Sequence, residues 1–252
     1  MAMRPALSLG VVLLSWYSLA ASGLVNSFLL PPPTAVMHRL AHLVATGDLF
    51  TDTAITVYRT LVGFAIAVAI GAAIGFWMGT SRFGEWLLDP IVSFLFSTPK
   101  ISFLPIFVLW FGVLDGSKIL MTAFICTFPV ISACHSGAKD INRLWQWVAQ
   151  NIGMSRPRIM QKIVVPATLP ALFTGSEISL PFAFISVSVS EMMTGGGGLG
   201  ARMMLSARFA DSATVVGVIL VLGVVGVALS AALTALRRGL LRWHTEIEVA
   251  VA

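Results

Sequence analysis

The chain has 252 residues, of which 57% are hydrophobic and only 11% are charged. A soluble domain carries about a quarter of charged residues, so this composition excludes an ordinary soluble protein. The net charge of +5 does not indicate a nucleic-acid binder, because such proteins gather Lys and Arg on an exposed face, whereas here the basic residues interrupt long apolar runs.

Six segments are apolar and long enough to approach the ~20 residues that a membrane helix needs. In chain order they are approximately 7–30, 54–80, 87–112, 117–135, 167–194 and 213–236. The sequence therefore predicts an all-α, polytopic membrane protein with one transmembrane domain over residues 1–252. For the first segment a cleaved signal peptide is the alternative, but the uncharged run is longer than the roughly 7 to 15 residues of such a peptide.

The second segment carries glycines on one side of the predicted helix, at Gly63, Gly71, Gly75 and Gly79. Small residues at helical spacing allow two helices to approach closely in lipid. We expect this stripe to pack against a neighbouring helix.

Prolines interrupt the third and fifth segments, at Pro90, Pro99 and Pro105 in the third and at Pro170 and Pro181 in the fifth. Inside a membrane, proline is tolerated where neighbouring helices or a watery cavity satisfy the freed backbone groups. We therefore expect breaks in both spans, next to a pathway.

Three ionisable residues well inside the predicted spans are of interest, because such residues are costly in a membrane and commonly line a pathway or pair with each other. Counting ~1.5 Å per residue, Lys100 and Glu177 lie at a similar depth, so they can meet and pair. Alternatively, Lys100 snorkels and Glu177 faces a watery vestibule. Glu191 precedes the glycine run 195–198, which indicates an outer gate, a docking surface or simply a flexible loop. Lys100, Glu177 and Glu191 are the candidate translocation-pathway residues.

The polar segment 136–165 separates the fourth and fifth spans. Apolar residues recur there at helical spacing, at Ile141, Leu144, Trp145, Val148, Ala149 and Ile152. Gly153 ends this helix, and Ser155 with Pro157 starts a second one over 158–165. The pattern predicts a rigid protrusion; an amphipathic helix lying on the membrane surface is the alternative.

The distribution of basic residues predicts the orientation, because cytoplasmic loops are enriched in Lys and Arg. With six spans and both termini in the cytoplasm, the cytoplasmic side receives Arg4, Arg82, Lys139, Arg143, Arg156, Arg158, Lys162, Arg237, Arg238 and Arg242. The outer side receives only Arg39, Lys118, Arg202 and Arg208.

Several motifs in this order resemble one family. They are residues 148–153 followed by Ser155 and Arg156, then 164–167 and 169–170, together with 30–33, 59–64, Pro99–Lys100, 104–105, 109–112, Glu191, 195–200 and 242–243. The chain resembles the permease subunits of binding-protein-dependent ABC importers, which are type I importer transmembrane subunits, and within them the sulfonate, nitrate and taurine branch.

This resemblance implies a permease subunit in the bacterial inner membrane that forms the translocation pathway with a second copy of itself. It also implies two ABC ATPase subunits and a periplasmic or lipid-anchored substrate-binding protein as partners. The substrate is then expected to be a small anion or organic acid, such as a sulfonate, taurine, nitrate or bicarbonate, with heterocyclic vitamin precursors as the alternative. By the same resemblance, the loop between the fourth and fifth spans couples to the ATPase through Trp147, Val148, Ala149, Gly153, Met154, Ser155 and Arg156.

One position departs from the family pattern. That pattern begins the coupling loop with Glu-Ala-Ala, whereas this chain has Trp147 and Val148 before Ala149. An acidic contact with the ATPase is therefore missing, and Trp147 offers an apolar contact instead.

Sequence motifs also bear on two other function classes, an enzyme and a transporter or channel without an ATPase. The sequence has no Walker glycine-lysine loop and no convergent catalytic set, so we expect no enzyme and no cofactor in this chain, with ATP and Mg on the partner ATPase. A secondary transporter or channel that works without an ATPase is the alternative. The loop around Gly153 discriminates between them, because only a coupled permease needs it.

Overall fold

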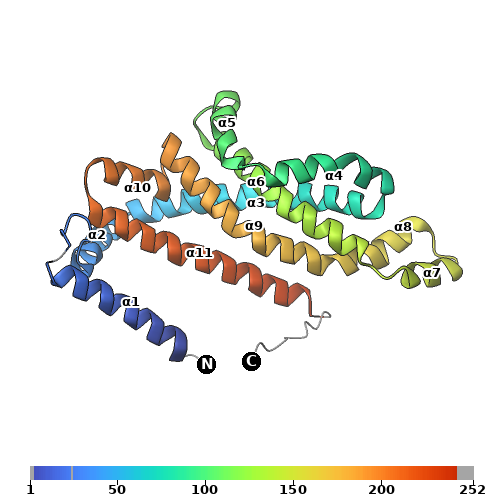
Figure 1. Cartoon of the computed structure of the whole chain (residues 1–252), viewed down its shortest axis with the longest axis horizontal. Helices are drawn as coiled ribbons and strands as arrows, with labels where there is room; N and C mark the ends of the chain where they lie inside the picture. The colour runs from blue at the N-terminus through green and yellow to red at the C-terminus, as the bar shows by residue number, and fades with distance from the viewer. Residues whose placement is uncertain (1–2, 24, 243–252) are drawn as a thin grey trace. The chain divides into compact units, whose positions relative to one another are not determined.

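The structure is a computed structural model that describes residues 3–23 and 25–242, and over those residues it contains helices and turns but no strand (Figure 1). The elements are α1 (Met3–Ala21), α2 (Pro33–Ala45), α3 (Asp48–Thr80), α4 (Arg82–Ser97), the 3-10 turn η1 (Lys100–Phe103), α5 (Leu104–Phe111), α6 (Asp115–Lys139), α7 (Arg143–Asn151), α8 (Arg156–Ile159), the π-helical η2 (Met160–Val164), α9 (Val165–Thr194), α10 (Leu199–Arg208) and α11 (Ser212–Leu240). The expected all-α class is confirmed.

Four helical segments among the described residues are long and apolar enough to cross a membrane: α3, α6, α11 and the stretch Pro157–Thr194 that ends with α9. The α4 helix and the segment Lys100–Phe111 qualify together only as one span with a bend of 93°. The segment expected over 7–30 is shorter, because α1 ends at Ala21 and Gly23 follows with a φ of +70°, a left-handed conformation typical of helix ends. Four or five spans follow from these lengths, and a count of six stays a prediction.

The two proline-containing segments behave differently. Around Pro99 the chain breaks as expected, since Thr98 is extended with a ψ of 141°, the conformation that a following proline favours. In the fifth segment the expected break is wrong, because α9 runs without interruption through Pro170 and Pro181. Each proline removes one backbone hydrogen bond, and the remaining bonds of this 30-residue helix keep it continuous.

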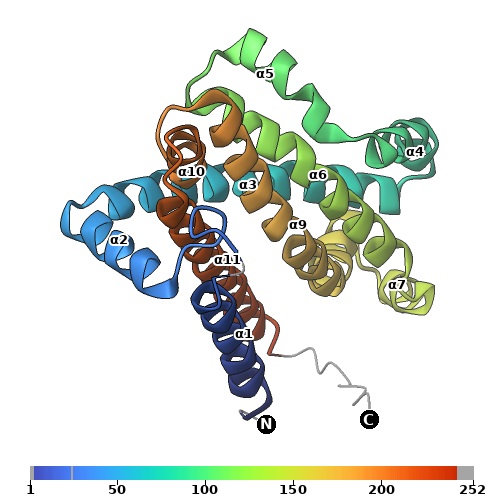
Figure 2. The same ribbon diagram turned by 60° about the vertical axis from the view of Figure 1, so that its left-hand side comes forward.

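The chain divides into two compact units, one of residues 1–58 with 187–225 and one of residues 59–186 with 226–252. In the second unit α6 runs alongside α3, as Figures 1 and 2 both show. The glycine stripe explains the close approach: a Cβ added at Gly71 would lie 2.7 Å from Val130 Cβ, and one at Gly75 would lie 2.6 Å from the Ile131 carbonyl oxygen. The predicted packing role of this stripe is confirmed.

In the first unit α2 packs against the start of α11. Leu40 lies 3.0 Å from where a Cβ of Gly217 would be, and Arg39 pairs with Asp211 at 2.9 Å. Arg39 also donates to the Thr214 hydroxyl at 2.9 Å. Neither α2 nor α10 is among the elements that the sequence predicts.

Candidate functional site

The predicted protrusion between α6 and α9 consists of α7, a glycine turn and α8. The Asn142 side chain accepts a hydrogen bond from the Leu144 amide at 2.9 Å and thereby caps the start of α7. Behind α7 a small apolar core joins Ala149 to Ile141, Ile159 and Val164. This core fixes the protrusion to the base of the second unit, so the segment is a built element and not a loose loop.

The turn after α7 is a Schellman motif. The Gly153 amide donates to the Gln150 carbonyl at 2.9 Å, and the Met154 amide donates to the Ala149 carbonyl at 3.0 Å. Gly153 has a φ of +80°, which side chains with a Cβ rarely adopt. Met154 packs against the core that contains Ala149, which is the apolar contact typical of this motif. Gly153 therefore sets the direction in which the chain leaves α7.

The outward side of α7 is apolar and exposed. Exposed fractions reach 57% for Trp147, 61% for Val148 and 73% for Ile152, and Leu144 and Trp145 are exposed as well. The apolar residues of the predicted helix face therefore fall into a buried group and an exposed group. A helix of nine residues buries only the narrow strip that meets the core behind it.

The seven expected coupling residues divide in the same way. Trp147 and Val148 project outward, whereas Ala149 is buried and Met154 is half-buried. Gly153 and Ser155 are exposed in the turn. The side chain of Arg156 lies outside the described residues.

Lys100 lies at the break between α4 and α5. Its Nζ donates to the Phe96 carbonyl at 2.8 Å and sits 5.2 Å from the ring centroid of Phe96 and 5.3 Å from that of Phe128. A cation over aromatic rings is stabilised by their negative faces. The break thus holds one amine among aromatic side chains instead of placing it next to a carboxylate.

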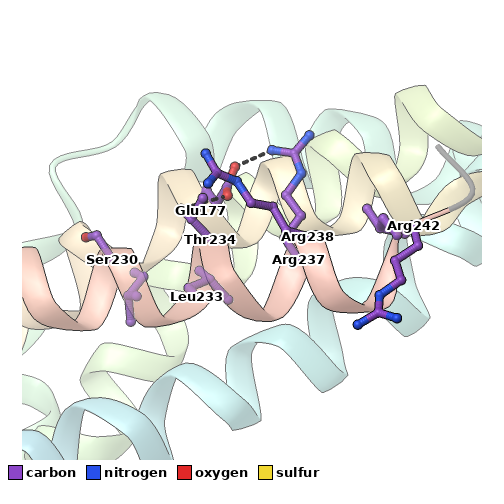
Figure 3. A pocket seen from close by; sticks show the side chains of 9 residues that line it. Glu177, Ser230, Leu233, Thr234, Arg237, Arg238 and Arg242 are labelled. Carbon is purple, nitrogen blue, oxygen red and sulfur yellow. Dashed lines mark hydrogen bonds and ion pairs between the residues drawn. The ribbon is translucent and has the colours of Figure 1, made fainter. Parts of the chain in front are cut away.

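Glu177 lies elsewhere in the second unit, facing α11. It accepts a hydrogen bond from the Thr234 hydroxyl at 3.2 Å and forms an ion pair with Arg237 (Figure 3). The pairing of Lys100 with Glu177 that equal depth allowed is therefore wrong. Equal depth along two helices does not fix the direction in which their side chains point, and α9 turns Glu177 toward α11.

A pocket of approximately 610 Å³ opens beside this ion pair. Its lining residues come from α9, from the end of α11 and from the two residues that follow this helix: Glu177, Leu180, Ser230, Leu233, Thr234, Arg237, Arg238, Leu241 and Arg242. In Figure 3 the side chains of Arg237 and Arg238 lie on the side of Glu177, whereas the guanidinium group of Arg242 points away from them. The pocket combines a surplus of positive charge with hydroxyl and apolar groups.

Glu191, in the first unit, is fully buried with an exposed fraction of 0%. Its carboxylate accepts from the Thr56 hydroxyl at 2.9 Å and from the Gly200 amide at 3.0 Å. Thr56 in turn accepts from the Leu199 amide at 2.9 Å. A Cβ on Gly198 would overlap the Glu191 carboxylate, so only glycine allows this approach.

The glycine run is therefore folded onto Glu191, and the flexible-loop interpretation of residues 195–198 is wrong. All four glycines have positive φ values between +69° and +99°, which a glycine adopts at no steric cost. Asp52 accepts from the Gly198 amide at 3.1 Å and pairs with Arg202. These contacts join α3, α9 and the start of α10.

Sequence reasoning missed three polar residues that the structure buries or pairs. Asp52 and Thr56 are four residues apart on α3, which is the spacing of one helix face. This spacing could have indicated that the two side chains lie together. Arg59 has an exposed fraction of 3% and pairs with Asp115 at 2.6 Å. No spacing rule connects those two residues, because they lie on different helices.

Comparison with known proteins identifies the family. The profile of the family described as "Binding-protein-dependent transport system inner membrane component" matches residues 65–243. The taurine transport system permease protein TauC of Escherichia coli (strain K12) is 28% identical over 96% of this chain and 90% of its own length. The formylaminopyrimidine transport permease protein ThiX of Halalkalibacterium halodurans is 29% identical over 96% of both chains.

Solved structures agree on the fold. An amino acid ABC transporter crystallised with histidines superposes with a TM-score of 0.65 at 14% identity, over 79% of this chain and 97% of that one. The inward-facing MetNI methionine ABC transporter superposes with a TM-score of 0.58 at 18% identity, over 75% of this chain and 97% of that one. The chain therefore belongs to the family of binding-protein-dependent transport system inner membrane components.

Proposed function

We propose that two copies of this chain form the translocation pathway of an ATP-driven importer for a small organic anion of the sulfonate type, and that α7 and the Gly153 turn transmit the movement of two ATPase subunits. The family membership supports the permease role. Two relatives support the sulfonate class. One is TauC, named for taurine transport. The other is the "Putative aliphatic sulfonates transport permease protein SsuC" of Bacillus subtilis (strain 168), which is 30% identical over 98% of this chain.

The observation that carries the coupling proposal is the exposed apolar side of α7. Leaving Trp147, Val148 and Ile152 in water is unfavourable by about 25 cal/mol per Å² of apolar surface, and such patches mark interaction sites. Their base is rigid, because Ala149 lies in the core behind α7. A rigid apolar projection can transmit force from a groove that encloses it.

Trp147 occupies the position where the family pattern has Glu. We infer that the ATPase of this importer offers an apolar pocket there, because a tryptophan side chain contributes binding through area burial and not through charge. An ATPase with a basic residue at that place forms no ion pair with this chain. Trp147 thus selects between ATPase partners.

The positions of the basic residues support an orientation with α7 and both termini in the cytoplasm and the Glu191 network on the outer side. The folded segment 195–200 then faces the side from which a binding protein delivers substrate. Glu191 acts on this side by holding the segment in shape. Lys100 and Glu177 remain our candidates for lining the pathway, each with the partners described above.

A channel or secondary transporter that needs no ATPase is the competing function, and a helix that only rests on the membrane is the competing role of α7. Replacing Gly153 by valine tests both. A valine at φ +80° is strained, and no atom lies within 4 Å of the added Cβ, so the change acts mainly through the backbone. Gly47 has a φ of +78° and equally open surroundings, which makes Gly47→Val the matched control.

The assay measures ATP hydrolysis and substrate uptake together in vesicles that contain the reconstituted importer with its ATPase and binding protein. We expect Gly153→Val to lower the number of substrates taken up per ATP hydrolysed, while Gly47→Val leaves that ratio near the wild-type value. Equal ratios in the two variants would contradict a coupling role for the Gly153 turn. Uptake by the permease alone would favour the channel.

A further inference from the structure

The pocket between α9 and the end of α11 has chemistry that pathway lining alone does not explain. Three polar residues of α11 recur at every fourth position, at Ser230, Thr234 and Arg238, so they share one face of the helix. Arg242 follows the end of α11 and also lines the pocket. Glu177 and Leu180 face them from α9. With approximately 610 Å³, the pocket falls within the ~300 to 1,000 Å³ that small-molecule sites occupy.

The charges of this pocket do not cancel. Arg237, Arg238 and Arg242 supply three positive charges and Glu177 supplies one negative charge, which leaves a surplus of two. The ion pair with Glu177 occupies Arg237. Among residues 3–23 and 25–242, no carboxylate forms an ion pair with Arg238 or Arg242. The surplus therefore resides on these two arginines.

The end of α11 itself accounts for part of the positive charge. Arg237 and Arg238 lie in the last turn of α11, where the helix dipole favours cations, and arginines beside a span fit a cytoplasmic end. Neither effect requires a concave site, and neither requires the hydroxyls of Ser230 and Thr234 on the same face. The combination of guanidinium and hydroxyl donors around a cavity is what a bound anion needs.

The geometry of the donors indicates the kind of anion. A guanidinium group presents planar, forked N–H donors that match oxygens held on one central atom, as in phosphate and carboxylate groups. Leu180, Leu233 and Leu241 also line the pocket and can cover a short apolar body. We propose that this pocket binds an oxyanion of the sulfonate, sulfate or phosphate type, that Arg238 and Arg242 are its binding cations, and that Glu177 keeps Arg237 from taking part.

This site extends the proposed function, and its position relative to the membrane rests on that proposal. In the proposed orientation the pocket lies at the cytoplasmic end of the span, where a transported sulfonate leaves the permease. The same chemistry is present in the phosphate of an anionic lipid headgroup, which basic pockets near the cytoplasmic surface also bind. The ligand chemistry itself follows from the pocket and does not depend on coupling to an ATPase.

The test is a binding titration on the full-length chain in nanodiscs made of phosphatidylcholine, without ATPase or binding protein. Methanesulfonate and sulfate are titrated by calorimetry at constant ionic strength. We expect saturable binding that the double variant Arg238→Gln with Arg242→Gln weakens about 10-fold or more, since hydrogen bonds to charged groups contribute about 1.5–3 kcal/mol each. Arg82→Gln removes an exposed arginine outside the pocket and is the matched control, with an affinity within about twofold of wild type by the same reasoning.

A second variant separates binding from a merely structural role of these side chains. Glu177→Gln keeps an acceptor for Thr234 but removes the charge that occupies Arg237. We expect it to raise the affinity for the anion, because a third guanidinium group becomes available. A loss of affinity in this variant would contradict the assignment of Glu177 as the group that sets Arg237 aside.

The lipid arm repeats the comparison in nanodiscs in which part of the lipid is phosphatidylglycerol. If the site is filled by the headgroup, phosphatidylglycerol raises the unfolding temperature of wild type and Arg82→Gln but not of the double variant, and it competes with methanesulfonate. The proposal is overturned if neither the free anions nor phosphatidylglycerol distinguish the double variant from Arg82→Gln. If wild type binds these anions but shows no ATP-driven uptake, the result contradicts only the proposed function.

Discussion

Replacing Gly198 with alanine tests whether Glu191 holds the glycine segment in place. Gly198 has a φ of 99° and a ψ of 166°, a region that is essentially restricted to glycine and costs other residues about 1–3 kcal/mol. The added Cβ would also overlap the Glu191 carboxylate. Glu191 is fully buried, so it has little room to move away.

The matched control is Gly195→Ala. Gly195 also has a positive φ, +69°, but nothing lies within 4 Å of its added Cβ. The control therefore carries the backbone strain of a left-handed residue, about 1–2 kcal/mol. Gly198→Ala carries backbone strain and in addition displaces the carboxylate, which weakens hydrogen bonds to a charged group worth about 1.5–3 kcal/mol each.

The assay is the unfolding of both variants in the same detergent, followed by thermal melting, with the fraction of folded protein after purification as a second measure. We expect Gly198→Ala to be less stable than Gly195→Ala by about 2 kcal/mol or more. Equal stability of the two variants would refute the view that the carboxylate of Glu191 and the backbone of residue 198 are packed against each other.

Two further predictions concern packing and pH. Gly75→Ala should lower the unfolding temperature, because its Cβ would lie 2.6 Å from a carbonyl oxygen of α6, whereas Gly223→Ala, with open space around it, should leave the temperature unchanged or raise it, since alanine favours helix by about 1 kcal/mol. At Asp211, before the α11 span, burial raises the pKa, but hydrogen bonds from Thr214 and the nearby Arg39 outweigh it, and the pKa is lowered. A carboxyl group with a lowered folded-state pKa stabilises the fold above its unfolded value of about 3.9 and loses this contribution as the pH falls through the folded value. Wild type should therefore approach the melting temperature of Asp211→Asn in acid and exceed it at pH 7, and a constant difference between the two would contradict this assignment.

The membrane helices and their small-residue packing could be predicted from the sequence because both depend on local composition. The run around Gly71 and Gly75 has no charge, and its glycines recur at helical spacing, so the contact with α6 needs only a neighbour of suitable shape. The Gly153 turn was predictable for the same reason. A glycine after an amphipathic helix is a local signal for a left-handed residue.

The partners of the buried charges could not be predicted, because they depend on how helices rotate and bend. Counting residues along the predicted spans placed Lys100 and Glu177 at a similar depth in the membrane. The 93° bend at the break and the direction of Glu177 toward α11 then separate them. Proline alone was equally ambiguous, since Pro99 follows an extended residue whereas Pro170 lies inside a continuous helix.

The exposed side of α7 was predicted as a helix face but not as an exposed one. Its periodicity shows that one face is apolar, yet periodicity does not tell whether the chain itself covers that face. Ala149 points into the core, and Trp147 and Ile152 do not. Only a partner or a membrane surface remains to cover them.

ATP hydrolysis by the purified transporter tests the coupling role of α7 most directly. The tagged chain is purified from its native host, and hydrolysis that copurifies with it is compared between wild type and a variant with Trp147, Val148 and Ile152 changed to serine. These three side chains are exposed, so the variant should melt at the wild-type temperature. We predict that hydrolysis copurifies with wild type and is lost from the variant. Equal hydrolysis in both preparations, or none with wild type, would contradict an ATPase docked on α7.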